Sequence, residues 1–186
     1  MRVISGSLKG KKLNFLNAPL TRPLKDMVRE SIFNTILHSN LINVQIQNSI
    51  ILDIYAGTGS FGIECISRGA GEVSFVEKDK SALKILRENL NKLSIINKSF
   101  VFPVDSKSFL KKKIKISKFD IIFLDPPFSD RDYLDCIKNI KEQKIFKKNN
   151  LIIIHREKSS QEDYKELFKI LKINVYGKSK IIFGSF

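Results

Sequence analysis

From residue 49 to residue 169, short apolar segments alternate with segments whose apolar residues recur at helical spacing. The apolar segments are SIILDI, EVSFVE, SFVFPV, FDIIFLD and NLIIIHR, and the helical segments lie near 60–68, 79–93, 106–113, 130–145 and 160–169. Such alternation is typical of right-handed βαβ units, which place parallel strands in one sheet with helices on both faces. The sequence therefore predicts an α/β fold with a mostly parallel sheet.

The two ends of the chain depart from this alternation. The C-terminal stretch KINVYGKSKIIFGSF indicates two strands joined at Gly177-Lys178, a hairpin that gives the sheet an antiparallel edge. Near the N-terminus, residues 2–5 and 11–15 predict a small hairpin, and residues 25–38 predict a helix.

The length and charge of the chain set further bounds. We expect 186 residues to form a single domain over 1–186, with a small extension at 1–45 and a catalytic α/β core at 46–186. The formal charge is 33 − 19 = +14, with a pI near 9.8. If the charge is clustered, nucleic acid is the leading partner; a solvated lysine coat is an equally weighted alternative.

Cysteine and histidine usage predicts no metal site. Cys65 and Cys136 lie far apart and fit no metal-ligand spacing, which favours a reducing compartment. His38 and His155 are equally isolated. The N-terminus has no apolar signal region, and no apolar run approaches membrane-spanning length, so we expect a cytoplasmic protein that does not bind membranes.

A glycine-rich turn follows the first predicted strand of the core. Residues 57–62 match G-x-G-x-x-G, a pattern that alone can reflect only a tight connection between strand and helix. Asp53 precedes the turn by four residues, where a dinucleotide fold normally continues its apolar strand because the bound pyrophosphate is anionic. An acid at this point favours a cationic ligand.

Two more acids follow the next two predicted strands. Glu77 lies 77 − 53 = 24 residues beyond Asp53, where a carboxylate can accept hydrogen bonds from both hydroxyls of a ribose. Asp105 closes FPVD and can accept a hydrogen bond from an adenine amine, although a helix N-cap explains it equally well. Three acids at successive strand ends suit S-adenosylmethionine, a nucleoside that carries a sulfonium.

The segment Asp125-Pro126-Pro127-Phe128 ends an apolar strand. The Asp125 carboxylate and the Pro126 carbonyl can accept the two hydrogens of an aromatic amine, on a loop that the prolines stiffen. Phe128 can stack on a flipped base. The separation of 125 − 53 = 72 residues leaves room for two βαβ units and places this strand beside the first one. The alternative is a rigid strand exit.

These motifs together resemble a known family. LDIYAGTGSFGIECISRGAGEVSFVEKD, DPPF, TRPLKDMVRESIFN, the lead-in MRVISGSLKGKKL and the closing YGKSKIIF resemble bacterial 16S ribosomal RNA guanine-N2 methyltransferases of the RsmD type. The resemblance covers nearly the whole chain. Departures from the family pattern fall at Leu24, Lys25, Met27, Tyr55, Thr58, Ser60 and Phe61. His155 stands where the family more often has an acid, and no role is predicted for it.

The resemblance implies a Rossmann-like class I methyltransferase fold with a seven-stranded sheet and an N-terminal extension. It implies methyl transfer from S-adenosylmethionine to the exocyclic N2 amine of a guanine in 16S rRNA, free or in an assembling small ribosomal subunit. We expect a monomer without a metal. The implied cofactor residues are Asp53, Tyr55, Ala56, Gly57, Thr58, Gly59, Glu77, Lys78, Asp105, Ser106 and Asp125, and the implied catalytic residues are Asp125, Pro126, Pro127 and Phe128.

The basic residues near the N-terminus predict an RNA-binding wall. Residues 1–30 hold seven basic side chains against two acids. We expect Arg22 and Arg29 near the target base, and Lys9, Lys11 and Lys12 on phosphates farther away.

Three other functions remain open from sequence alone. D-P-P-aromatic suits any planar exocyclic amine, so an amino methyltransferase of adenine or cytosine in DNA or another RNA is the first alternative. A nicotinamide dehydrogenase would explain the glycine turn and Glu77, but not Asp53 or Asp125. A noncatalytic RNA-binding protein of ribosome assembly is the third.

Overall fold

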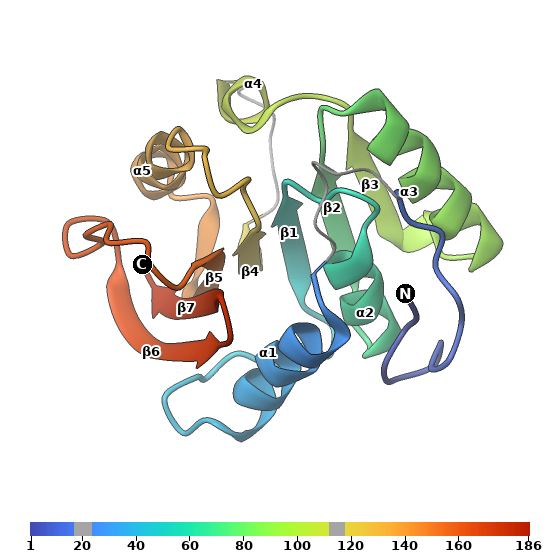
Figure 1. The fold of residues 1–186 in the computed structure, drawn as a ribbon, viewed down its shortest axis with the longest axis horizontal. Coiled ribbons are helices and arrows are strands. Elements are labelled where there is room, and N and C mark those ends of the chain that lie inside the picture. Colours follow the sequence, from blue (N-terminus) through green and yellow to red (C-terminus); the bar gives the residue numbers. More distant parts are fainter. Residues whose placement is uncertain (17–23, 112–117) are drawn as a thin grey trace.

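The computed structural model describes residues 1–16, 24–111 and 118–186. Except at 160–169, its elements follow the predicted alternation (Figure 1). The strands are β1 (Ile50–Ile54), β2 (Glu72–Val76), β3 (Ser99–Phe102), β4 (Phe119–Leu124), β5 (Phe146–Glu157), β6 (Lys169–Tyr176) and β7 (Ser179–Ser185). The helices are α1 (Asp26–His38), α2 (Ser60–Ser67), α3 (Lys80–Lys92), α4 (Ser106–Lys111) and α5 (Tyr133–Gln143), with a short 3-10 turn at Ile96–Lys98.

The seven strands form one sheet in the order β3-β2-β1-β4-β5-β7-β6. The first five strands run parallel, whereas β7 pairs antiparallel with both β5 and β6. This confirms the predicted Rossmann-like fold of a class I methyltransferase with an antiparallel C-terminal hairpin. It also confirms that the strand before Asp125 lies beside the first strand.

Apolar clusters cover both faces of the sheet because its central strands are buried on both sides. One cluster joins residues of α1, α2 and α3 to one face, and the other joins α4 and α5 to the opposite face (Figure 1). Strand alternation makes the division clear: Leu151 and Ile153 belong to the first cluster, and Ile152 and Ile154 to the second.

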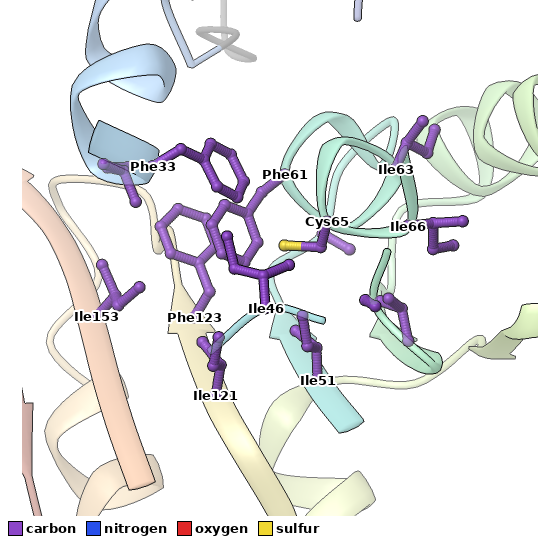
Figure 2. Close-up of a cluster of buried hydrophobic side chains, with 14 of the residues drawn as sticks. Phe33, Ile46, Ile51, Phe61, Ile63, Cys65, Ile66, Ile121, Phe123 and Ile153 are labelled. Atoms are coloured by element: carbon purple, nitrogen blue, oxygen red, sulfur yellow. The ribbon is translucent and has the colours of Figure 1, made fainter. Parts of the chain in front are cut away.

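A column of aromatic rings joins α1 and α2 to the sheet (Figure 2). The Phe61 ring stacks on Phe123 of β4 at 4.0 Å between centroids and on Phe33 of α1 at 5.4 Å. All three side chains are almost fully buried. This column fixes α2, the helix that follows the glycine turn, against the strand that leads to Asp125.

The N-terminal segment is attached to α2 through the buried Glu64. Its carboxylate accepts the backbone N–H groups of Ile4 at 2.7 Å and Ser5 at 2.9 Å. The predicted hairpin is reduced to a single antiparallel bridge between Arg2 and Lys12. The segment shares the first apolar cluster with α1 and α2, and the division of the domain at residue 45 stays a prediction.

The prediction of a helix at 160–169 was wrong. In the structure residues 160–164 have no regular secondary structure, residues 165–167 form a single turn in which the Phe168 N–H donates to the Tyr164 carbonyl at 3.1 Å, and β6 begins at Lys169. Glu162 pairs with Arg156, and the Tyr164 hydroxyl lies 2.6 Å from that of Tyr133. These contacts with other elements replace the helix that the local pattern predicts.

Across the described ranges, no helix is long and apolar enough to span a membrane. Within the same residues, no group of three His, Cys, Asp or Glu side chains is arranged to hold a metal ion.

Candidate active site

A cavity of about 1230 Å³ opens at the carboxyl ends of the central strands. Its lining comes from the glycine turn after β1, from Glu77 and Lys78 after β2, and from the 125–130 segment after β4. The end of β5, the turn between β6 and β7, the start of α4, and residues of α1 and α5 also contribute. Open parallel sheets bind ligands at this edge, where the strand order reverses.

The glycine turn has backbone angles that most residues avoid. Gly57 and Gly59 have φ values of +56° and +86°, and Tyr55, without the freedom of glycine, has a φ of +63°. A Cβ atom at Gly59 would lie 2.4 Å from Leu86 Cδ1 of α3. Glycine at 59 is therefore favoured by the left-handed turn, and a side chain there would have to displace the Leu86 methyl group of α3.

Asp53 stabilises the glycine turn through a hydrogen bond to the backbone. Its side chain is not among the lining residues, and its Oδ2 accepts the N–H of Gly62 at 3.0 Å, in the first turn of α2. Burial raises the pKa of Asp53 well above its ordinary value of 3.8, and the charges of Asp125 and Glu77 raise it further. The contact with the methionine part of a cofactor, which the resemblance implies for Asp53, stays a prediction.

The Glu77 carboxylate accepts hydrogen bonds from two backbone segments, the glycine turn after β1 and the residues after β2. One carboxylate oxygen accepts the N–H of Gly57 at 2.8 Å, and the other accepts those of Lys78 and Asp79, each at 2.8 Å. A carboxylate has about four acceptor positions, so about one remains free for a ligand hydroxyl. Glu77 thus links β2 to the glycine turn.

Asp105 lies at the start of α4 rather than at the end of a strand, since β3 ends at Phe102. Its carboxylate accepts the Ser108 N–H at 2.7 Å and the Ser108 hydroxyl at 2.8 Å, and these bonds hold the pKa of Asp105 below its ordinary value. It caps the helix and still lines the cavity, beside Ser106, whose hydroxyl lies 3.3 Å from that of Tyr55.

The Asp125–Phe128 segment leaves β4 directly into the cavity. The Asp125 N–H still donates to the carbonyl of Ile54 at 3.3 Å, and the next three residues also line the cavity. Arg156 donates to the carbonyls of Pro127 and Phe128. Among the residues that the structure describes, the Pro126 carbonyl accepts no hydrogen bond, so it can receive one from a ligand.

Sequence reasoning missed His155 and Ser179. His155 Nδ1 lies 2.8 Å from Asp125 Oδ1, and its Nε2 lies 2.9 Å from the Ser179 hydroxyl. The pairing of Leu124 with Ile154 places Asp125 beside His155 at the strand ends. A prediction of register could have found this pair, whereas residue type alone could not.

The predicted RNA residues fall into three groups. Lys9, Lys11 and Lys12 are exposed but do not line the cavity. Arg22 lies outside the described residues. Arg29 is fully buried, donating to the Arg2 carbonyl and to Asp26 at 3.0 Å, with Glu64 3.9 Å away. The expectation of an RNA contact at Arg29 is therefore corrected, because its side chain has no surface to offer.

Basic and apolar side chains that were not predicted lie at the cavity. Lys25, Met27, Phe15 and Lys178 all contribute to its lining. Met27 is 65% exposed and Phe15 46% exposed, which is unusual for large apolar residues unless a partner covers them. The cavity thus combines carboxylates at the strand ends with lysines and apolar side chains from α1, its approach and the β6–β7 turn.

Comparison with known proteins agrees with this architecture. The family model described as conserved hypothetical protein 95 matches residues 1–185. A Haemophilus influenzae protein named ribosomal RNA small subunit methyltransferase D is 35% identical over 178 residues, covering 95% of this chain and 89% of its own length. A protein of the same name from Buchnera aphidicola is 36% identical over 156 residues, covering 84% of this chain and 78% of its own.

Solved structures show the same fold. A putative methyltransferase from Escherichia coli superposes with a TM-score of 0.81 at 27% identity, covering 99% of this chain and 96% of that one. A putative methylase from Haemophilus influenzae gives a TM-score of 0.77 at 32% identity, covering 98% and 96%. With a family model matched over 1–185 and relatives identical at 35% and 36%, the chain belongs to the family of ribosomal RNA small subunit methyltransferase D.

Proposed function

We propose that this protein transfers the methyl group of S-adenosylmethionine to the N2 amine of a guanine in 16S rRNA. The observation that carries the proposal is the pair of acceptors at Asp125 and Pro126, which face the same cavity as the glycine turn. The names of the relatives, which are ribosomal RNA small subunit methyltransferases, support the class of substrate.

The lining of the cavity fits S-adenosylmethionine, which supplies an electrophilic methyl group on a positively charged sulfur. Glu77, Asp105 and Asp125 place three carboxylates around the cavity. In this assignment Ala56, Gly57 and Thr58 lie along the methionine part, the remaining acceptor position of Glu77 receives the ribose, and Asp105 with Ser106 lies beside the adenine. Asp53 and Gly59 contribute by fixing the shape of the turn.

The acceptors orient the amine. Asp125 and the Pro126 carbonyl each accept one N–H of the guanine amine, so the nitrogen presents its lone pair toward the methyl carbon. Phe128 stacks on the base. When bound, S-adenosylmethionine would supply the methyl group, with the electron pair of the broken carbon-sulfur bond staying on sulfur. Asp125 would accept the proton that the methylated nitrogen then loses.

The basic segment at the N-terminus supplies the grip on RNA in this proposal. Lys9, Lys11 and Lys12 are exposed, and the segment that carries them is attached to α2 by hydrogen bonds to Glu64. Lys25 and Lys178 at the cavity bring positive charge closer to the target base. Contacts of this kind bind phosphates without reading sequence.

Mapping a labelled methyl group tests the proposal. The protein is incubated with methyl-labelled S-adenosylmethionine and either free 16S rRNA or small-subunit particles from cells that lack the enzyme, and the modified nucleoside is identified. We expect N2-methylguanosine at one position, with the Asp125→Ala variant as the inactive control. Label on adenine or cytosine would overturn the proposed target, and cofactor binding without any transfer would favour a noncatalytic role.

A further inference from the structure

We propose that two consecutive residues at the end of β5, His155 and Arg156, are positioning residues that hold the 125–128 segment from opposite faces of the sheet. The proposal rests on the proposed function, because it concerns how the acceptors for the amine are fixed. Neither residue needs to touch the substrate or the cofactor.

The opposite orientation of the two side chains follows from strand geometry. Side chains alternate along β5, so residue 155 continues the row of Leu151 and Ile153, and residue 156 that of Ile152 and Ile154. His155 therefore lies on the face that α1 and α2 cover, and Arg156 on the face that α5 covers. One strand end thus reaches the 125–128 segment from both sides.

On the first face, His155 fixes the carboxylate of Asp125. Because a carboxylate only accepts, Nδ1 of the imidazole carries the proton and donates it to Asp125 Oδ1 across 2.8 Å. In the neutral ring Nε2 is then an acceptor, and the Ser179 hydroxyl, 2.9 Å away, donates to it. This contact fixes the plane of the carboxylate, and the second oxygen, Oδ2, which accepts no hydrogen bond within the described part of the chain, is free to receive the amine of the substrate.

On the second face, Arg156 fixes the backbone. Its two terminal nitrogens donate to the Pro127 carbonyl at 3.1 Å and the Phe128 carbonyl at 2.9 Å. The guanidinium lies 4.4 Å from the centre of the Tyr133 ring and pairs with Glu162 at 3.1 Å. Arg156 is only 2% exposed, and burying a charge this deeply is unfavourable unless its partners are well placed.

Together the two side chains determine which acceptors remain for the substrate. His155 contacts Asp125 Oδ1, and Arg156 donates to the carbonyls that follow Pro126. Among the residues that the structure describes, Asp125 Oδ2 and the Pro126 carbonyl accept no hydrogen bond, and both residues line the cavity. We infer that His155 and Arg156 set the spacing and direction of this pair, which an exocyclic amine must match.

Three substitutions at His155 separate positioning from simple space filling. The amide nitrogen of His155→Asn falls near the place of Nδ1 and can still donate to Asp125. That of His155→Gln falls near Nε2, toward Ser179, and His155→Leu fills the space without any donor. We expect Gln and Leu to lower kcat by up to about 100-fold, the loss that misplacing reacting groups by about 1 Å produces. Asn should restore most of kcat.

At Arg156, lysine keeps the charge beside Glu162 but cannot donate to two carbonyls in fixed directions. We expect Arg156→Lys to lower kcat while KM for RNA and the Kd for S-adenosylhomocysteine stay unchanged. The matched control is Lys147→Gln, at the opposite end of the same strand, where Lys147 pairs with Asp120 on the surface. This variant should show wild-type kcat and KM.

The outcomes distinguish this inference from the proposed function. Steady-state kcat and KM are measured on the substrate that the wild-type protein methylates, with cofactor binding followed by calorimetry. A wild-type protein without methyl transfer refutes the proposed function. If the wild type is active and Leu at 155 turns over as fast as Asn, or if Lys at 156 leaves kcat unchanged, the positioning roles are refuted. A kcat that Asn restores and that Gln and Leu do not, at constant cofactor Kd, supports the role of His155.

Discussion

Glu77→Gln tests whether one carboxylate joins β2 to the glycine turn. The wild-type side chain accepts three backbone N–H groups, one on one oxygen and two on the other. A glutamine has one carbonyl oxygen, so its best orientation keeps the bonds from Lys78 and Asp79 and turns an amide N–H toward the Gly57 N–H. At least the charge-assisted hydrogen bond from the Gly57 N–H is lost, and the glutamine amide N–H then faces the Gly57 N–H, so that two donors oppose each other.

The size of the effect follows from this count. Hydrogen bonds to charged groups contribute about 1.5 to 3 kcal/mol, and partial exposure of Glu77 favours the lower value. For a domain of this size 1 kcal/mol shifts Tm by about 2 to 4 °C, so we expect Tm to fall by roughly 3 to 6 °C. Because the same turn contacts the cofactor in our proposal, affinity should fall by about tenfold or more.

Two measurements check this prediction: thermal unfolding of the free protein, and calorimetric titration with S-adenosylhomocysteine. Glu72→Gln is the matched control, because it changes an exposed glutamate at the start of the same strand. If Glu77→Gln keeps both the Tm and the affinity of the wild type, the turn does not depend on this carboxylate, and the argument is refuted.

Three other perturbations probe the site. Asp125→Ala should lower turnover on the order of 100-fold or more by removing one preorganised acceptor, while calorimetry shows cofactor binding largely intact; near-normal turnover would exclude the role of Asp125. Replacing Lys9, Lys11 and Lys12 together with alanine should weaken RNA binding and flatten its salt dependence by roughly 0.7 to 0.9 per lost phosphate contact, and an unaltered slope would identify a solvated coat. Burial raises the pKa of Asp53 above 3.8, so the folded state holds this proton more tightly and the wild type loses stability as pH rises above that value. Asp53→Asn keeps an acceptor for Gly62 without titrating, so its Tm relative to the wild type should increase between about pH 4 and pH 7, and a constant difference would contradict the raised pKa.

The parts of the fold that sequence predicts are those that depend on repeated local patterns. Apolar runs, helical spacing and a hairpin turn at Gly177 were enough for the strands and for their mixed directions. The stretch at 160–169 has an equally helical pattern, yet it forms no helix, and Glu162 and Tyr164 contact Arg156 and Tyr133 from other elements. Tertiary contacts of this kind leave no mark on local spacing.

The site residues also divide into those that local sequence patterns predict and those whose contacts come from tertiary structure. Glycines and acids at strand ends placed the turn, Glu77 and the 125–128 segment at one cavity, because strand ends of a parallel sheet converge. Arg29 belongs to a basic stretch of the sequence, but in the structure its side chain is buried beside the carboxylate of Glu64. His155 and Arg156 gain their contacts from strand register, which becomes visible only when β4 and β5 are paired.

The position of β7 bears on the order in which the protein can be completed during synthesis. It is the last strand in the sequence, yet it lies between β5 and β6 inside the sheet. Until it emerges from the ribosome, β5 has an unpaired edge, and Ser179 cannot reach His155. The pairing of β1 with β4 and the glycine turn can thus form on a nascent chain before β7 covers the edge of β5.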